Sequence, residues 1–155
     1  MSSRLSAGIA GGLAAGVVFG MMMQMMEAPT PDGGGVPMMS MIAMIVGSTS
    51  VAVGWLYHLF NSAVIGATFA WVLGRRILSY GSGLGWGAAY GFGWWIVGGL
   101  ILMPALLGMP PFAPLMMPPM RSVAIGSLIG HLVYGLILGG VYVRFVGLVP
   151  RRVAA

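Results

Sequence analysis

Long runs of apolar residues alternate with short polar segments along this chain. Residues 5–26 follow Arg4 without a charge, and residues 38–74 carry none before Arg75 and Arg76. About 20 apolar residues suffice for a helix to cross the hydrocarbon core of a bilayer. The second run is longer than one upright helix needs, so we divide it into a short segment at 38–46 and a spanning helix at 49–73.

Two further apolar runs complete the pattern. Residues 84–107 predict a third spanning helix and residues 122–145 a fourth, with Arg144 near enough to its end to reach the interface. The proline- and glycine-containing segments at 27–37 and 109–120 predict loops. The chain is therefore expected to be an all-α membrane protein with four transmembrane helices. Residues 5–26 also fit a signal peptide, but the run is long for one.

Composition supports a membrane protein and narrows its chemistry. The chain of 155 residues is 59% hydrophobic and 6% charged, whereas about a quarter of the residues in a soluble domain are charged. There are no cysteines, which excludes disulfides, thiolate metal sites and cysteine nucleophiles. The net charge of +5 comes from arginine, and in such a chain it indicates topology rather than nucleic-acid binding.

The arginines predict the orientation. Six of them fall on one side of a four-span arrangement, namely Arg4, Arg75, Arg76, Arg144, Arg151 and Arg152. Arg121 falls on the other side with the two acids, Glu27 and Asp32. Because positive charge is enriched in cytoplasmic loops, we expect a multi-pass protein of the plasma membrane with both termini in the cytoplasm.

An internal repeat with a period of 73 residues organises the chain. His58 and His131, the only histidines, are equivalent under this period, and Gly8 and Gly12 align with Gly81 and Gly85 without a gap. The repeat predicts a single membrane domain, with repeat 1 at about 1–74, repeat 2 at about 75–147 and a tail at 148–155. Each copy holds two helices, so the copies are expected to be parallel and related by a pseudo-twofold axis along the membrane normal.

The segments around the two histidines carry a resemblance. Trp-Leu-Tyr-His-Leu-Phe at 55–60 and Gly-His-Leu-Val-Tyr-Gly-Leu-Ile-Leu-Gly-Gly-Val-Tyr at 130–142 are similar to motifs of a family of small, functionally uncharacterised four-helix integral membrane proteins. Members of that family carry a histidine-glycine motif in each of two repeats. The resemblance implies the fold and transfers no catalytic residue.

The histidine pair is the main candidate site. Both residues are expected near mid-membrane, where ionisable side chains are costly and mark functional sites. One interpretation is structural, with neutral imidazoles hydrogen-bonded across helices and with Asn61 and Tyr134 in the same network. A second is a metal or cofactor held between the imidazoles, with haem b the first alternative and copper the second. A third covers proton transfer, quinone contact or solute passage.

Small residues flank both histidines at intervals of four, which places them on one helix face. A porphyrin would be able to lie close to the backbone there, so the predicted cofactor contacts include Gly54, Gly66, Gly135 and Gly139, with Ser62 and Ser127 beside them. The glycines of the first and third helices also fit small-xxx-small packing between membrane helices. Helix packing alone suffices to explain the regularly spaced glycines of the first and third helices.

Methionine is a third candidate for function, after the histidines and the small residues around them. The chain has 15 methionines, most of them around the segments that precede the second and fourth helices. Thioether ligands select Cu(I), which makes a copper relay conceivable. The alternative is that methionine fills irregular gaps between helices, and the spread of these residues around several helix faces favours it.

The chain offers no Ser-His-Asp set, phosphate-binding loop or pair of buried carboxylates, so it is not expected to be an enzyme. The interpretation that these features favour is a non-catalytic subunit of a larger respiratory or redox membrane complex, active in electron transport. The alternative is a small transporter or channel that works as an oligomer, with copper or another small solute as cargo. Expected partners are membrane lipids and other membrane subunits or a second copy of the chain, and no nucleic acid.

Overall fold

Four long helices make up most of the structure, a computed structural model that describes residues 2–30 and 32–146. Within the described residues, the apolar spans are Ser3–Gln24, Val51–Leu73, Tyr80–Leu106 and Pro118–Val146, and each is long enough to cross a membrane. The expected all-α membrane fold with four transmembrane helices is therefore confirmed. The tail at 148–155, with Arg151 and Arg152, lies outside the described residues.

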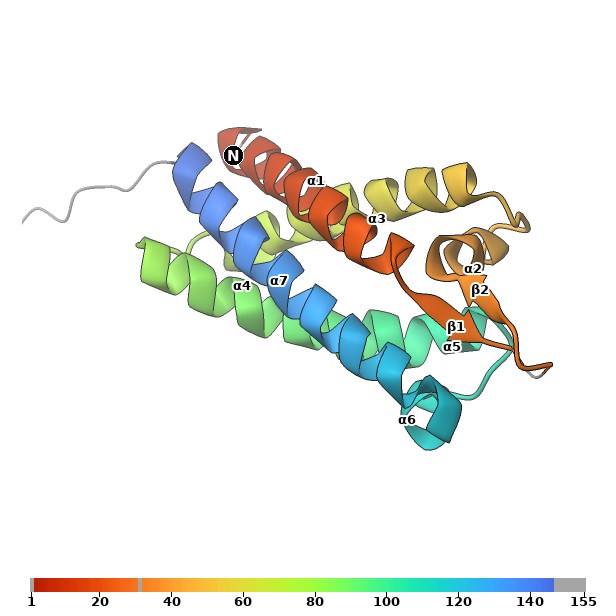
Figure 1. Cartoon of the computed structure of the whole chain (residues 1–155). Coiled ribbons are helices and arrows are strands. Elements are labelled where there is room, and N and C mark those ends of the chain that lie inside the picture. Colours follow the sequence, from red (N-terminus) through yellow and green to blue (C-terminus); the bar gives the residue numbers. More distant parts are fainter. Residues whose placement is uncertain (1, 31, 147–155) are drawn as a thin grey trace, which may run out of the picture.

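The first two spans are uninterrupted α-helices close to their expected bounds. Helix α1 covers Ser2–Gln24 and α3 covers Val51–Leu73. Helix α1 packs against both α3 and α7 (Arg121–Val146), so the N-terminal apolar run is an integral part of the bundle. Figure 1 shows α1 and α7 side by side across the front of the molecule.

The third span begins earlier than the apolar run predicts. Helix α4 covers Tyr80–Trp94. Its start is fixed by two reciprocal hydrogen bonds: the Ser82 N–H donates to the Ser79 hydroxyl at 3.1 Å, and the Ser79 N–H donates to the Ser82 hydroxyl. Such a capping box satisfies N–H groups that the first turn leaves without partners. Four residues that precede the expected start at 84 therefore belong to the helix.

Beyond α4 the third span changes its winding. Residues Trp95–Leu102 form a π-helix, η1, and Met103–Leu106 form the short helix α5. Pro104 has no N–H to offer the carbonyl of Leu100, four residues before it. That carbonyl accepts instead from the Phe112 N–H at 2.6 Å, which folds the following loop back onto the span.

Short elements cover one end of the bundle. The expected loop at 27–37 forms an antiparallel hairpin of β1 (Glu27–Pro29) and β2 (Gly35–Pro37). The expected short segment at 38–46 is α2 (Met38–Met44), which packs against α3. A turn of helix, α6 (Ala113–Met116), and a 3-10 turn, η2 (Pro118–Met120), precede α7.

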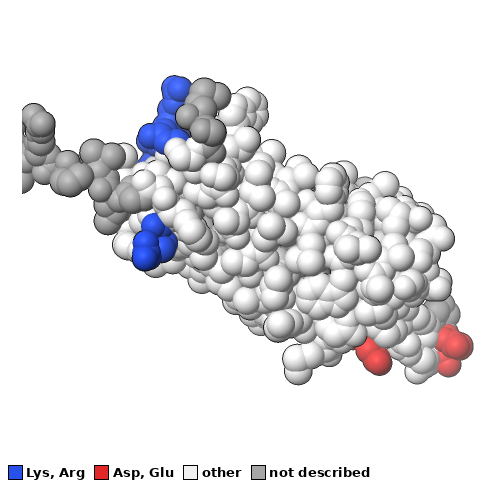
Figure 2. Space-filling model, turned by 90° about the horizontal axis from the view of Figure 1, so that it is seen from above, with Lys and Arg blue, Asp and Glu red and all other residues white. Residues whose placement is uncertain are grey.

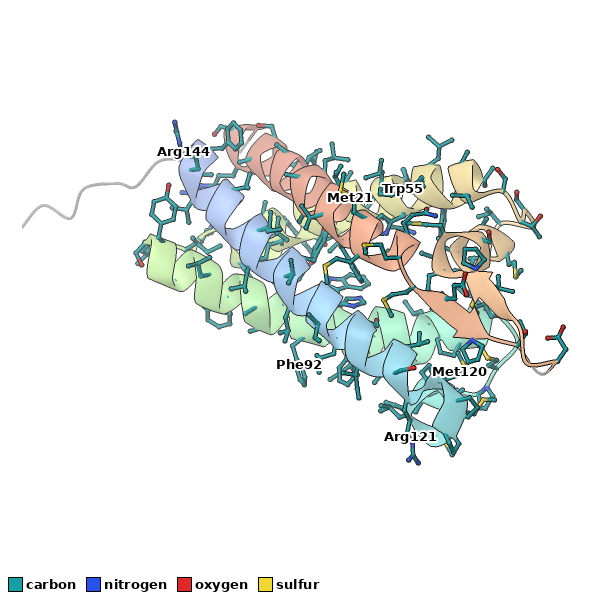
Figure 3. All side chains as sticks on the ribbon, viewed as in Figure 1. Met21, Trp55, Phe92, Met120, Arg121 and Arg144 are labelled. Carbon is teal, nitrogen blue, oxygen red and sulfur yellow. The ribbon has the colours of Figure 1, made fainter. Side chains whose placement is uncertain are left out.

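Charged side chains separate to the two ends of the molecule. Arg4, the turn with Arg75 and Arg76, and Arg144 lie at one end, which we call the arginine end. Glu27, Asp32 and the short elements lie at the other, which we call the loop end; Figure 2 shows this separation of basic and acidic residues. Arg121 is at the loop end and Arg144 at the arginine end of the same helix (Figure 3).

Glycine contacts hold each helix pair together at its arginine end. A Cβ on Gly12 would overlap the Ser62 carbonyl of α3, and one on Gly87 would overlap the Gly135 carbonyl of α7. Ser62 and Gly135 keep the period of 73, but their partners Gly12 and Gly87 are 75 residues apart. Gly85, the expected equivalent of Gly12, has no atom within 4 Å of its Cβ position. The helix contacts of the two halves therefore differ by two residues from the gapless alignment in the first helix of each copy.

Candidate ligand cavity between the helices

A cavity of about 250 Å³ lies in the loop-end half of the bundle. Its walls come from α1, α2, α3, η1 and α7, and the elements of the loop end cover it. Toward the arginine end the cavity stops where Tyr90 of α4 donates a hydrogen bond to the Ile65 carbonyl of α3 at 3.0 Å. Phe69 packs against the same tyrosine ring at 5.2 Å.

The cavity exists because the two halves of the molecule are not packed symmetrically. Under a twofold relation, the close contact of α1 with α7 would be repeated between α4 and α3. Helix α1 does pack along α7, whereas α3 and α4 do not pack along each other. Aromatic contacts of Tyr90 join them at one level only, and the cavity takes the place of the missing contact.

Both histidines face this cavity. The Nε2 of His58 lies 2.9 Å from the Gly16 carbonyl of α1, and a carbonyl oxygen can only accept, so Nε2 carries the proton. The Nδ1 of His131 lies 2.8 Å from the Ser127 carbonyl, one turn earlier on α7, and 3.3 Å from the Ser127 hydroxyl. By the same reasoning Nδ1 of His131 carries the proton.

The remaining ring nitrogens therefore offer lone pairs. Within the described residues, the Tyr142 hydroxyl is the only fully buried side-chain nitrogen or oxygen without a hydrogen-bond partner. The Nδ1 of His58 and the Nε2 of His131 are thus not sealed by protein, and both residues line the cavity. These two nitrogens are therefore available as hydrogen-bond acceptors or metal ligands.

Phe19 of α1 sets the relative position of the two imidazoles. Its ring lies 5.7 Å from that of His58 and 4.7 Å from that of His131, edge-on in both cases. Both histidines are therefore at the level of the same aromatic ring, as their equivalence in the repeat predicts. Phe19 is the only aromatic residue of the first apolar run and aligns with Phe92 under the period of 73, but the sequence does not show that it packs against both histidines.

The expected hydrogen-bond network of the histidines is only partly present. Tyr134 lines the cavity, but its hydroxyl donates to the Ser62 carbonyl at 2.9 Å and not to His131. Asn61 also lines the cavity, and its amide has no hydrogen-bond partner among the described residues. Backbone carbonyls, which sequence patterns do not reveal as partners, take the place that Asn61 and Tyr134 were expected to fill.

The four glycines predicted as porphyrin contacts do not line the cavity. A Cβ on Gly54 would overlap the Met39 carbonyl of α2, and Gly66 is equally close to the Gly8 carbonyl of α1. Gly135 and Gly139 lie against the carbonyls of Gly87 and Gly83 on α4. Their assignment to a cofactor is thus corrected, because neighbouring backbone already fills the space.

A haem between the histidines conflicts with this geometry. Ligation through Nε2 of His58 would require that nitrogen to leave the Gly16 carbonyl, and Phe19 already occupies the space beside both rings. A metal ion bound through Nδ1 of His58 and Nε2 of His131 would leave the hydrogen bonds to the Gly16 and Ser127 carbonyls in place. The cavity therefore suits a small ligand better than a porphyrin.

The methionines are more concentrated than the sequence indicates. Seven of the 15 line the cavity, namely Met23, Met26, Met38, Met41, Met103, Met109 and Met120. Figure 3 shows the sulfur atoms gathered in the half of the molecule away from Arg144. They come from α1, α2, the third span and the segments before α7, so only the fold brings them together. Other methionines point outward, as Met25 does with 88% of its surface exposed.

The π-helix forms one wall of the cavity, through Gly98, Gly99 and Leu100. Trp95 fixes this wall to α7, since its indole N–H donates to the Ala124 carbonyl at 3.1 Å. Trp94 lines the cavity itself. A π-helical segment often marks a functional site, and Pro104 was the available signal for it in the sequence.

Among the described residues, no Asp, Glu, Lys or Arg side chain lines this cavity. The described residues also contain no group of three or more His, Asp or Glu side chains that would hold a metal by themselves. Comparisons of the chain with known protein families, curated proteins and solved structures found no match. The resemblance to the uncharacterised four-helix family stays a prediction.

Proposed function

We propose that this protein is a non-catalytic integral membrane protein that holds a small ligand, a metal cofactor, at the histidine pair, as a subunit of a membrane complex with a redox role. The observation that carries the proposal is that His58 and His131 line one cavity and that each commits one ring nitrogen to a backbone carbonyl, which leaves the other nitrogen unprotonated. A histidine that binds a metal usually donates its other N–H to a carboxylate or a backbone carbonyl. Both histidines have such a partner.

The proposal includes the setting of the protein. Under the positive-inside rule, the arginine end faces the cytoplasm and the loop end faces the other side of the plasma membrane. The outward helix faces carry large apolar side chains, such as Leu56 and Phe60 of α3, which are 71% and 65% exposed. Lipids or the helices of other membrane subunits would cover these faces.

Elemental analysis and an absorption spectrum of the full-length protein, purified in detergent from the membranes in which it is made, test the proposal. We expect a stoichiometric bound group that His58→Ala and His131→Ala each abolish, while the variants remain monodisperse. Leu56→Ala, on the outward face of the same helix as His58, is the matched control and should keep the group. A wild-type protein without any bound group, or variants that retain it, would refute the proposal.

A second function is a transporter, favoured by one observation. The cavity reaches from the loop end to the histidines, but the arginine end is closed by helix packing and by Tyr90. A cavity confined to one half of the span, with the other half closed by packing, is the kind of asymmetry that one state of an alternating-access transporter shows. Uptake of a metal ion into liposomes containing the protein, in excess of that into empty liposomes, would support this function over the first.

A further inference from the structure

We infer that the ligand of the cavity is a monovalent copper ion, Cu(I), bound by the two imidazoles together with methionine sulfur. This inference rests on the proposed function and names its ligand. The cavity offers an incoming ion two kinds of lone pair, from unprotonated imidazole nitrogens and from thioethers. Imidazole accepts several transition metals, but thioether ligands select Cu(I).

The charge of the lining points to the same ion. The chain has no cysteine, and none of the described carboxylates lines the cavity, so the ligand set that the described residues offer is uncharged. Bringing an ion into a low-dielectric interior without a counter-charge is strongly unfavourable, and the penalty grows with the square of the charge. A monovalent ion is therefore better tolerated than Zn²⁺ or Cu²⁺.

Methionines line the same cavity as the two histidines. Met23 lies one helical turn beyond Phe19 on α1, and Phe19 touches both imidazoles. Met23 is buried, with 7% of its surface exposed. Met103 approaches from the opposite wall, at the end of the π-helix. The flexible thioether side chain can rotate toward an ion without moving the backbone.

Titration of the metal-free, full-length protein with Cu(I) under anaerobic conditions, against a colorimetric Cu(I) chelator, tests the inference. We expect one Cu(I) per chain, lost in the double variant His58→Ala/His131→Ala. The combined variant Met23→Leu/Met26→Leu/Met103→Leu should weaken binding at least about ten-fold, which corresponds to about 1.4 kcal/mol. Leucine conserves the volume of methionine, so this variant should fold.

The matched control is Met25→Leu, which changes a methionine between Met23 and Met26 that points outward. It should bind Cu(I) as the wild type does. X-ray absorption of selenomethionine-labelled protein provides a direct readout, since copper bound as inferred shows selenium among its neighbours. Copper without selenium neighbours, or binding that survives the loss of both histidines, would overturn the inference.

The outcome also separates the inference from the proposal on which it rests. A protein that fails to bind Cu(I) but carries another group lost with His58→Ala refutes the copper assignment and leaves the cofactor function standing. A protein that binds neither Cu(I) nor any other group at the histidines refutes both.

Discussion

Phe112 and Tyr134 adopt a backbone conformation and a hydrogen bond, respectively, that their residue types alone do not predict. Phe112 is the only non-glycine residue with positive φ in the described part of the chain, at 64°. A bulky side chain in the left-handed region is unfavourable by about 1–2 kcal/mol. The Phe112 N–H donates to the carbonyl of Leu100, which lines the cavity. The strained backbone at Phe112 therefore accompanies a hydrogen bond that holds this part of the cavity wall.

Replacing Phe112 separates this strain from the loss of its ring. Phe112→Ala keeps the left-handed strain, whereas Phe112→Gly removes it, and both lose the same partly exposed phenyl group. We expect the glycine variant to be more stable than the alanine variant by about 1 kcal/mol. Thermal unfolding in detergent measures the difference. Equal stability of the two variants would show that the backbone at 112 relaxes.

Tyr134 offers a second test at this scale. Its hydroxyl joins α7 to α3 through the Ser62 carbonyl, and hydrogen bonds between membrane helices average about 0.6 kcal/mol. Tyr134→Phe should lower the free energy of unfolding by about that amount. Tyr80→Phe, at a position with 46% of its surface exposed, is the control and should change nothing. A loss several times larger would mean that the hydroxyl supports more than one contact.

At the scale of whole elements, length and hydropathy determine the spans, but not which face of a helix is buried. Helix α4 has glycine at 81, 83, 85, 87, 91 and 93, so two ladders of small residues are available on different faces. A repeat period alone selects Gly81 and Gly85, while the contacts with α7 use Gly83, Gly87 and Gly91. The periodicity of α4 does not include its partner helix α7, and it is the packing of α7 that decides which glycine ladder is buried.

The two ladders of α4 make a matched pair of substitutions. Gly87→Ala places a methyl group against the Gly135 carbonyl, whereas Gly85→Ala points into open space. Overpacking of this kind typically destabilises by about 1–3 kcal/mol, so the first variant should unfold earlier in detergent. The second should be neutral or slightly more stable, because alanine favours helix. The reverse order would mean that α4 is rotated about its axis.

At the scale of the whole molecule, the four spans and the separation of charge follow from the sequence, and the cavity does not. Charged residues mark ends of the first, second and fourth apolar runs, at Glu27, Arg75 and Arg121, and a proline-containing segment follows the third. The cavity depends on the absence of packing between α3 and α4, and the symmetry expected from the repeat predicts the opposite. Methionines from five separate segments converge there, which only the folded arrangement can show.

The orientation proposed for the whole molecule is directly testable, since the chain has no cysteine. Leu78, in the turn between α3 and α4, has 67% of its surface exposed, and Asp32 is exposed in the hairpin turn. Single-cysteine variants Leu78→Cys and Asp32→Cys should react with an impermeant thiol reagent from opposite sides of the membrane. In intact cells only the second should be labelled. Labelling of both from outside would refute the four-span topology.

The π-helix has a consequence for chains of slightly different length. Each of its hydrogen bonds spans one residue more than in an α-helix, so a π-helical segment behaves like an insertion that the helix absorbs. A relative that lacks one residue within 95–102 could wind this region as a plain α-helix and still keep the contacts of Gly83, Gly87 and Gly91 with α7. Such a chain would preserve the bundle but turn a different face toward the histidines. A difference of one residue in length would then mark which relatives keep this wall of the cavity.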